Sequence, residues 1–424
     1  MIVISVSYCF NEQLLSMYTV YIVFVMPESK GKLFSRAMPY LYKEERKMRK
    51  ILVLLMIFAL LFNIAACGSG KDAGTAKKDI KIGVSIWSST DTLGAPSKQM
   101  IDAAADALGV EVMYVDQAHI SEQVTASVET LAAAGCDGII VCNSSAAEMT
   151  SIINTCNEHK VYVAQFYRYL NEEDNPDEYA LAVSSPYYVG AVHEDEIQNG
   201  YTLAQILCEK GSRVIALQGW EPGDSTFLAR WEGYKKGVEA WNEANPDDQA
   251  VLLEPQYGGT TSDTGRATAE AILSANPDAD ALIVSGGGGD PLVGAISAIE
   301  GLGLTGKINV ASTDFLPDLE EQLKKGAIAV ESGGHFCDPL YAFMLVYNAV
   351  VGNYEVPTDG FYEILFPYIY ISSPEEYAEY DKYFVEQLPY NEEELIEMSK
   401  YSFEELKKSA EALSIEEVKS RRGE

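Results

Sequence analysis

Residues 137–166 read DGIIVCNSSAAEMTSIINTCNEHKVYVAQF. The two ends of this stretch, 137–142 and 161–166, are apolar runs of strand length, and the part between them, 146–160, has the apolar spacing of an amphipathic helix. Apolar strands that alternate with amphipathic helices are typical of a parallel sheet that helices cover on both faces. The stretch therefore predicts an α/β fold.

The same alternation continues on both sides. Upstream, we expect strands at 79–86 and 110–116 and helices at 95–109 and 120–135. Downstream, a second series begins with a helix at 194–211; we expect its strands at 213–219, 249–255, 280–286, 308–313, 328–333 and 361–371, and its helices at 226–245, 263–277, 291–303, 315–326 and 339–353. Two series of this kind predict two doubly wound, Rossmann-like lobes.

Residues 372–424 break the alternation. They are acidic and rich in tyrosine, and they predict short helices, with a frayed end at 414–424. We interpret this segment as an acidic C-terminal extension of the two-lobed fold.

The N-terminal part contains a segment typical of protein export. Residues 48–66 begin with Met48, Arg49 and Lys50 and continue with an apolar run that is short for a membrane span. They end in Ile-Ala-Ala before Cys67, which resembles the lipobox of bacterial lipoproteins. We therefore predict a cleaved lipoprotein signal at 48–66, a lipid on Cys67 and a flexible polar tether at 67–78; the alternative is an uncleaved anchor helix.

Residues 1–47 precede this signal. Residues 43–47 read KEERK, whose codons can consist of purines alone, as in a ribosome-binding site. We therefore interpret 1–47 as a translation-start overrun ahead of Met48. The alternative is a second membrane segment at 13–26, which is short and rich in tyrosine.

Charge and cysteine content limit the possible functions. The chain has a formal net charge of −32, which disfavours nucleic-acid binding because an acidic surface repels phosphates. The five cysteines after Cys67 do not form a CxxC pair, and most lie in apolar segments. We expect them to be small buried hydrophobic residues rather than a dense disulfide framework.

Several motifs resemble cofactor sites without meeting their requirements. The loop SGGGGD at 285–290 lacks the third glycine of a dinucleotide fingerprint, and GLGLTGKI at 301–308 lacks the final Ser or Thr of a phosphate loop. We interpret the first as a loop at a ligand cleft and the second as a helix end and turn. The four histidines do not have zinc-ligand spacing, so we expect no metal, no cofactor and no catalytic residue.

Aromatic and planar polar residues follow several of the expected strands. In open α/β sheets, ligands bind at the carboxyl ends of the strands. Aromatic faces and multidentate hydrogen-bonding groups at such a place suit a small hydroxylated ligand. The predicted ligand-binding residues are Trp87, Asn143, Tyr167, Arg168, Trp220, Asp290, Asp314 and His335.

The chain resembles the type I periplasmic binding proteins of the ribose- and galactose-binding kind over about 79–371. The phrases RVIALQG and ARWEGYKKG look like that family's start of a second lobe, with an Arg-x-x-Gly signature at Arg230 and Gly233. INVASTD resembles the strand that delivers a ligand-binding aspartate, here Asp314. Asn143 and Arg168 fall where the family binds sugar hydroxyls, whereas Leu228 stands where an arginine often contacts the ligand.

The resemblance implies two lobes joined by a three-segment hinge. Lobe one would comprise 79–183 and 337–356, and lobe two 184–336 and 357–371. It also implies a monomeric, non-enzymatic solute-binding protein of an ABC importer, which captures a small ligand, expected to be a carbohydrate, and delivers it to a membrane permease. With lipid on Cys67, it would be anchored outside the cytoplasm on the bacterial cell membrane.

Three alternatives remain at this point. A ligand sensor that acts on a membrane receptor would share the binding fold. LacI-type repressors share the core but need an N-terminal helix-turn-helix, where this chain has an export signal. An exported enzyme on the same architecture lacks the support of an assembled triad, a metal site or a nucleotide loop.

Overall fold

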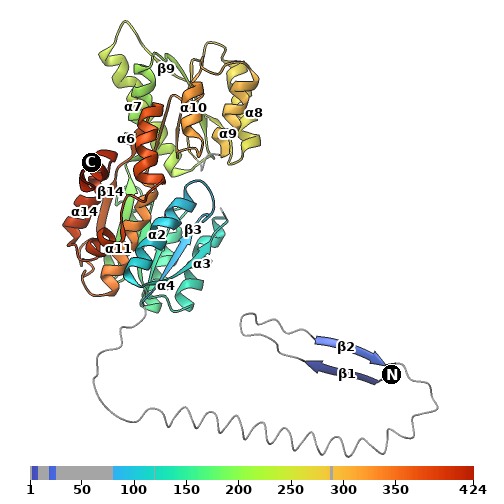
Figure 1. The fold of residues 1–424 in the computed structure, drawn as a ribbon, viewed down its shortest axis with the longest axis vertical. Helices are drawn as coiled ribbons and strands as arrows, with labels where there is room; N and C mark the ends of the chain where they lie inside the picture. Colours follow the sequence, from blue (N-terminus) through green and yellow to red (C-terminus); the bar gives the residue numbers. More distant parts are fainter. Residues whose placement is uncertain (1, 8–18, 25–79, 119, 287–289) are drawn as a thin grey trace, which may run out of the picture. The chain divides into compact units, whose positions relative to one another are not determined.

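The computed structural model describes residues 2–7, 19–24, 80–118, 120–286 and 290–424. The chain divides into two units, 1–77 and 78–424 (Figure 1). In the first unit β1 (Ile2–Ser7) pairs with β2 (Thr19–Phe24) in antiparallel fashion. The expected signal at 48–66, Cys67 and the tether lie outside the described residues. Within the described part, we find no helix of the length and apolarity that a membrane crossing requires.

The second unit contains a first sheet of six parallel strands. Its order is β14-β7-β6-β5-β3-β4. The strands are β3 (Lys81–Ile86), β4 (Glu111–Asp116), β5 (Gly138–Val141), β6 (Tyr162–Phe166), β7 (Tyr188–Glu194) and β14 (Tyr362–Phe366). Residues of β5 and β7 are buried throughout, as expected for strands that helices cover on both faces.

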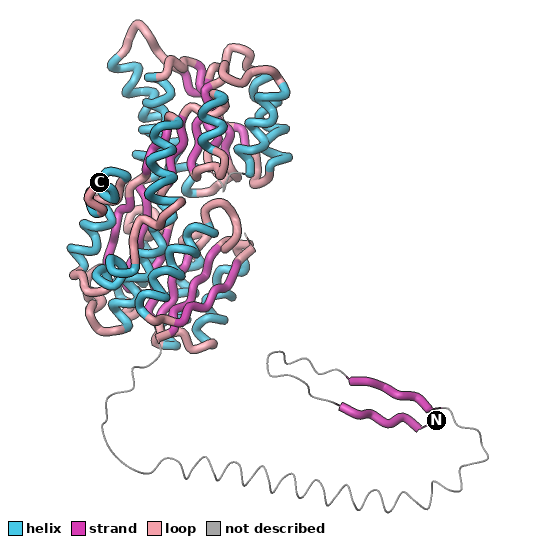
Figure 2. Tube along the Cα trace, viewed as in Figure 1, coloured by secondary structure: helices cyan, strands magenta, loops and turns pink. Residues whose placement is uncertain are grey.

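The second sheet repeats this arrangement. Along β10-β8-β11-β12-β13-β15 all pairs are parallel except the last, and β9 also pairs with β8. The strands are β8 (Val214–Gly219), β9 (Val251–Leu252), β10 (Gln256–Tyr257), β11 (Ala281–Val284), β12 (Asn309–Thr313), β13 (Val330–Gly333) and β15 (Ile369–Ile371). The prediction of two doubly wound lobes is confirmed (Figure 2).

Helices cover both sheets. Those of the first lobe are α2 (Gly94–Leu108), α3 (Glu122–Ala133), α4 (Glu148–His159), α5 (Pro176–Ser184) and α11 (Asp338–Val350). Those of the second lobe are α6 (Glu196–Glu209), α7 (Ser225–Ala244), α8 (Ser262–Ala275), α9 (Asp290–Gly301) and α10 (Leu319–Lys325). The segment at 301–308 ends α9 and turns into β12, as the sequence predicted.

Helices α6 and α7 approach closely at two glycines. A Cβ on Gly200 would lie 2.2 Å from the carbonyl oxygen of Arg230, and one on Gly233 would lie 2.1 Å from that of Ile197. No side chain fits at such distances, so both positions require glycine. The close contact explains the Arg-x-x-Gly signature in physical terms, because it fixes the turn of α7 that carries Arg230.

The chain passes between the lobes three times, but two crossings differ from the expected boundaries. The first lies between β7 and α6 instead of at 183/184, because β7 pairs with β6 and extends the first sheet to Glu194. The second runs through the short 3₁₀ helix η2 (His335–Cys337). The third lies between β14 and β15 instead of at 356/357, because β14 pairs with β7.

The five cysteines of the second unit are free and buried, as the sequence predicted. Cys156 and Cys208 are fully buried among apolar side chains of separate clusters. Burial raises the pKa of the Cys142 thiol to about 11, so this group remains uncharged at neutral pH.

The C-terminal extension is an ordered part of the fold. It comprises α12 (Pro374–Tyr380), the π-helix η3 (Asp381–Val385), α13 (Glu392–Met398), α14 (Phe403–Glu411) and α15 (Ile415–Arg421). Capping boxes begin α13 at Asn391 and α14 at Ser402. The expectation of a frayed end was wrong, because Val418 of α15 is fully buried.

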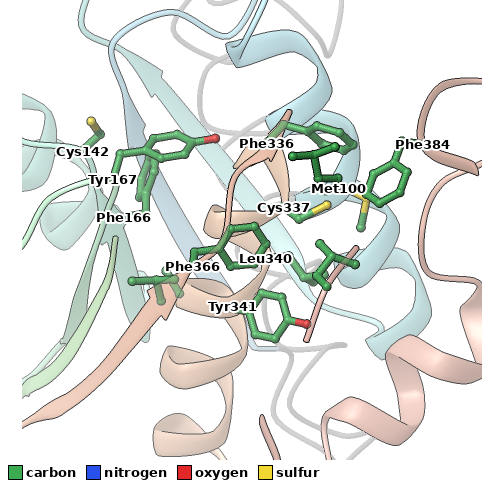
Figure 3. Packing of buried hydrophobic residues seen from close by; sticks show 14 of the residues in the cluster. Met100, Cys142, Phe166, Tyr167, Phe336, Cys337, Leu340, Tyr341, Phe366 and Phe384 are labelled. Atoms are coloured by element: carbon green, nitrogen blue, oxygen red, sulfur yellow. The ribbon is translucent and has the colours of Figure 1, made fainter. Parts of the chain in front are cut away.

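The extension packs against both lobes. Helix α12 contacts α10 of the second lobe, whereas α13 contacts α2 and α14 contacts β14 of the first. Tyr380 packs edge-on against Phe315 with ring centroids 4.7 Å apart, and Phe384 lies close to Phe336 and Met100 (Figure 3). The hydroxyls of Tyr341 and Tyr390 are hydrogen-bonded at 2.7 Å. The extension therefore shares one core with the lobes.

This packing predicts that the extension contributes to stability. Leu406 of α14 is fully buried, so Leu406→Ala should lower the free energy of unfolding by about 2–5 kcal/mol through lost burial and a cavity. Urea denaturation of the full chain measures this change. Val385→Ala is the matched control, since Val385 is 54% exposed, and it should have little effect. Equal effects of the two substitutions would contradict the shared core.

Candidate functional site

A cavity of about 630 Å³ lies at the carboxyl ends of the strands of both sheets. The first lobe lines it with residues that follow β3, β5 and β6, and the second with residues that follow β8, β11 and β12. His335 and Tyr368 come from the second and third crossings of the chain. The cavity therefore has walls from both lobes and a side formed by the hinge.

Seven of the eight predicted site residues line this cavity: Trp87, Asn143, Tyr167, Arg168, Trp220, Asp314 and His335. The eighth, Asp290, is the first residue of α9 at the carboxyl end of β11. Its side chain lies outside what the structure describes. These seven residues are far apart in the sequence. They were predicted from the rule that ligands bind at the carboxyl ends of strands, and they line one cavity.

The two lobes present equivalent residues at equivalent strand ends. Trp87 follows β3 directly, and Trp220 follows β8 directly. Each strand is next to the edge of its sheet: β3 lies beside the edge strand β4, and β8 lies beside β9 and β10. Tyr167 follows β6 with φ of 58°, and Asp314 follows β12 with φ of 74°. Non-glycine residues rarely adopt this left-handed backbone, and such strain is concentrated at functional sites. At Tyr167 and Asp314 the left-handed backbone changes the direction of the side chain at the end of the strand.

Aromatic rings form a continuous series along the cavity. Tyr167 contacts Trp87 with ring centroids 5.5 Å apart and His335 with centroids 5.3 Å apart, both edge to face. Tyr368 lies 4.8 Å from His335. The Trp87 indole is also fixed by a 2.7 Å hydrogen bond that it donates to Asp91. These contacts hold the aromatic faces in place before any ligand arrives.

Asp314 and His335 form a buried pair. Their Oδ1 and Nε2 atoms are 3.2 Å apart, and both side chains are less than a tenth exposed. Burial lowers the pKa of His335, but the hydrogen bond to Asp314 and the surrounding acidic side chains outweigh it and raise the pKa overall. The pair therefore favours a charged imidazolium beside a carboxylate.

Arg168 comes from the first lobe. Its Nη1 donates to the carbonyl oxygen of Tyr167 at 2.7 Å, which fixes the guanidinium. Its buried Nε has no hydrogen-bond partner among the described residues. A buried donor without a partner is costly, so this N–H favours a change that would supply an acceptor, while the Arg168 side chain lines the cavity.

Arg230 belongs to a network that sequence reasoning missed. Its guanidinium donates to both carboxylate oxygens of Glu196 at 2.7 and 2.8 Å, and Tyr368 donates to the same carboxylate at 3.1 Å. Burial opposes the charge of Arg230, yet Glu196 keeps its pKa well above the ordinary value. Leu228, at the position expected for an arginine, is 43% exposed, and Arg230 supplies the guanidinium instead.

Other lining residues were also missed. Glu194 ends β7, a strand absent from the prediction, and Glu196 begins α6, where the helix dipole favours a carboxylate. Six acidic side chains line the cavity, against the side chains of Arg168, Arg230 and His335: Asp91, Glu194, Glu196, Glu221, Asp224 and Asp314. This balance disfavours an anionic ligand. Among the described residues we find no group of three or more potential metal ligands.

The comparisons with known proteins agree with this geometry. A family model described as a periplasmic binding protein domain matches residues 82–334. The ribose import binding protein of Bacillus subtilis (strain 168) is 23% identical over 230 residues, which cover 54% of this chain and 68% of that protein.

Solved structures show the same fold. A periplasmic solute-binding protein from Actinobacillus succinogenes 130z, with bound D-allose, is 18% identical with a TM-score of 0.60 and covers 71% of this chain and 100% of its own. A solute-binding protein from Bacillus halodurans C-125, with bound myo-inositol, is 22% identical with a TM-score of 0.59 and covers 74% and 100%. The binding protein of an arabinose transporter from Shewanella sp. ANA-3 is 21% identical with a TM-score of 0.59 and covers 72% and 96%.

The network around Arg230 gives a test of the site's architecture. Glu196→Ala should lower the free energy of unfolding by about 3–5 kcal/mol, because it leaves a buried guanidinium without its counter-charge. Glu321→Ala is the control, since its pair with Lys325 is exposed, and it should have little effect on the free energy of unfolding. Thermal or urea denaturation of both variants measures the difference. A loss at Glu196 no larger than that of the control would show that the Arg230 pair is not buried as described.

Proposed function

Since the chain belongs to the periplasmic binding protein family, we propose that it is a solute-binding protein of an ABC importer, which holds a neutral hydroxylated ligand, a sugar or similar polyol, between its lobes. Bound ligand would close the lobes, and the closed form would present it to a membrane permease. Like others of its family, the protein acts by binding and release and not as an enzyme.

The observation that carries this proposal is the placement of Arg168 and Asp314. They follow equivalent strands, β6 and β12, of different sheets and line one cavity. A carboxylate accepts hydrogen bonds from hydroxyl groups, and a guanidinium donates to hydroxyl or ring oxygens. A ligand with several hydroxyls can satisfy both, and its apolar faces suit the series of rings from Trp87 to Tyr368.

The chemistry of the cavity narrows the ligand class. The excess of carboxylates would repel a phosphate or a carboxylate on the ligand. Similar proteins have been solved with D-allose, with myo-inositol and with arabinofuranose, all of which are neutral and rich in hydroxyls. The ligands of these similar proteins support a neutral polyol as the ligand class, and they do not identify the individual compound.

We extend the proposal to the site of action. The sequence at 48–66 supports export, and the cysteine that follows supports lipid attachment. The polar segment 67–78 would then tether the folded unit to the outer face of the cell membrane.

Thermal shift measurements with a panel of small molecules test the ligand class. We expect stabilisation by at least one neutral sugar or inositol, because a ligand that binds only the folded state at a hundredfold excess over Kd adds about 2.7 kcal/mol. Asp314→Asn should weaken that binding about tenfold, since a neutral amide replaces a charged acceptor while asparagine still tolerates the left-handed backbone.

Asp247→Asn is the matched control, because Asp247 is exposed and belongs to the loop after α7. It should leave the affinity unchanged. Stabilisation by carboxylates or phosphates, and by no neutral polyol, would contradict the proposed ligand class.

Fractionation of bacterial cells tests the anchor. Wild-type protein should partition with membranes, because lipoprotein processing places two or more acyl chains on one cysteine and two suffice for stable anchoring. Cys67→Ser should release the protein or leave it unprocessed. Mass spectrometry of the N-terminus provides the control, and wild-type protein recovered without lipid and with 1–66 attached would exclude this reading.

A further inference from the structure

Two carboxyl groups meet at the hinge side of the cavity. Glu194 ends β7 at the first crossing, is 5% exposed and lines the cavity. Asp338 begins α11 after the second crossing and is fully buried. The Oδ1 atom of Asp338 accepts a 3.2 Å hydrogen bond from the backbone N–H of Tyr167, which has the left-handed backbone described above.

The other oxygen of Asp338, Oδ2, has no donor among the described residues, and neither has Oε1 of Glu194. Helix α11, which Asp338 begins, packs on β7, which Glu194 ends. The side chains are close enough for a hydrogen bond between them to shift both pKa values. Two ionised carboxylates in contact would repel strongly in a buried place, and neither could donate. A proton between them satisfies both oxygens and removes one of the two charges.

We propose that Glu194 and Asp338 share a proton at the hinge and that Glu194 meets the ligand as an uncharged carboxyl. Asp338 acts as a positioning residue, because it holds both Glu194 and the strained backbone of Tyr167. In this form the O–H of Glu194 is donated to Asp338, so Glu194 presents the ligand with an uncharged acceptor oxygen, whereas Asp314 presents a charged one. The part of this inference that concerns the ligand rests on the proposed function, whereas the shared proton does not.

The surroundings favour the neutral form. Burial raises the pKa of Glu194 well above its ordinary value and the charge of Asp338 raises it further, while His335 lowers it and Glu196 raises it. Burial also raises the pKa of Asp338, against the hydrogen bonds from Glu194 and Tyr167. Among the other ionisable groups close to Asp338, Cys142 would raise its pKa if charged and Arg168 lowers it. The Cys337 thiol and the Tyr167 hydroxyl also interact with the charge of Asp338.

The sign of the pH effect follows from the raised pKa. A folded state that keeps a proton which the unfolded chain has lost is destabilised as pH rises, until the folded state also loses it. The contribution of the pair to stability is therefore present at acid pH and disappears as pH rises through the raised folded pKa. Glu331 adds to the same trend, because burial raises its pKa to about 8, so its effect must be separated.

Infrared difference spectroscopy of the full chain without ligand tests the shared proton directly. Wild-type protein at neutral pH should show the carbonyl band of a buried protonated carboxyl, and Glu194→Gln should remove it. Glu331→Gln is the control that assigns the band of Glu331. If no band is lost in Glu194→Gln, the proposal is wrong, whatever the protein binds.

Stability across pH gives the second readout. From about pH 5 to about pH 9, the Tm of Glu194→Gln should fall less than that of wild type, because the glutamine amide donates to Asp338 without titrating. Asp338→Asn should behave in the same way, since asparagine can accept from Tyr167 and donate to Glu194. Asp338→Ala should destabilise the folded protein, because alanine can do neither. Asp338→Asn also carries the test if Glu194→Gln does not fold. Unchanged pH dependence in both conservative variants would overturn the proposal.

Affinity for D-allose or myo-inositol, whichever shifts the Tm, tests the ligand contact. Glu194→Gln should keep the affinity at neutral pH within about threefold, and Glu194→Ala should lose roughly tenfold or more, the equivalent of one hydrogen bond. Equal affinities of wild type and Glu194→Ala would remove Glu194 from the site and leave the solute-binding function standing. If neither probe binds, that result counts against the proposed function. It does not affect the infrared test of the shared proton.

Discussion

Parallel strands bring all their carboxyl ends to one edge of a sheet. In this protein the cavity lies at those edges of both sheets, and its walls in the two lobes depend on that arrangement. Helices on both faces keep the strands buried, so the strand ends are the places where polar side chains can enter the cavity. The close contact of Gly200 and Gly233 between α6 and α7 serves the same arrangement, since it fixes Arg230 toward the cavity.

Burial sets the chemistry inside the cavity. A charged group taken out of water needs a partner, and the site provides one in two cases: Glu196 for Arg230 and His335 for Asp314. The carboxyl of Glu194 has another carboxyl, that of Asp338, as its neighbour. A proton kept between the two removes one of the two negative charges. A cavity organised in this way can bind a neutral ligand without introducing or removing charge.

The sequence predicted the fold class and most of the cavity lining, for a physical reason. Apolar periodicity identifies buried strands, and the position just after such a strand identifies Trp87, Asn143 and Asp314 without knowledge of the rest. The strand β7 was missed because its segment YYVGAVHE stands directly before a charged helix start, and the lobe boundaries and Glu194 were missed with it. Arg230 lies on a helix, where only the contact with α6 decides which way it faces. Tyr368 enters the site because the chain crosses there, which no local pattern indicates.

The C-terminal extension lies outside the cavity, yet it contacts α10 in one lobe and α2 in the other. Any rotation of one lobe against the other must therefore slide or break aromatic contacts such as that of Tyr380 with Phe315, the residue next to Asp314. Part of the free energy of ligand binding is then exchanged with packing far from the ligand, which is a thermodynamic coupling between two sites. Solved relatives align over their full length with about seven-tenths of this chain. Their affinities would not transfer to this protein even if every residue around the ligand were the same.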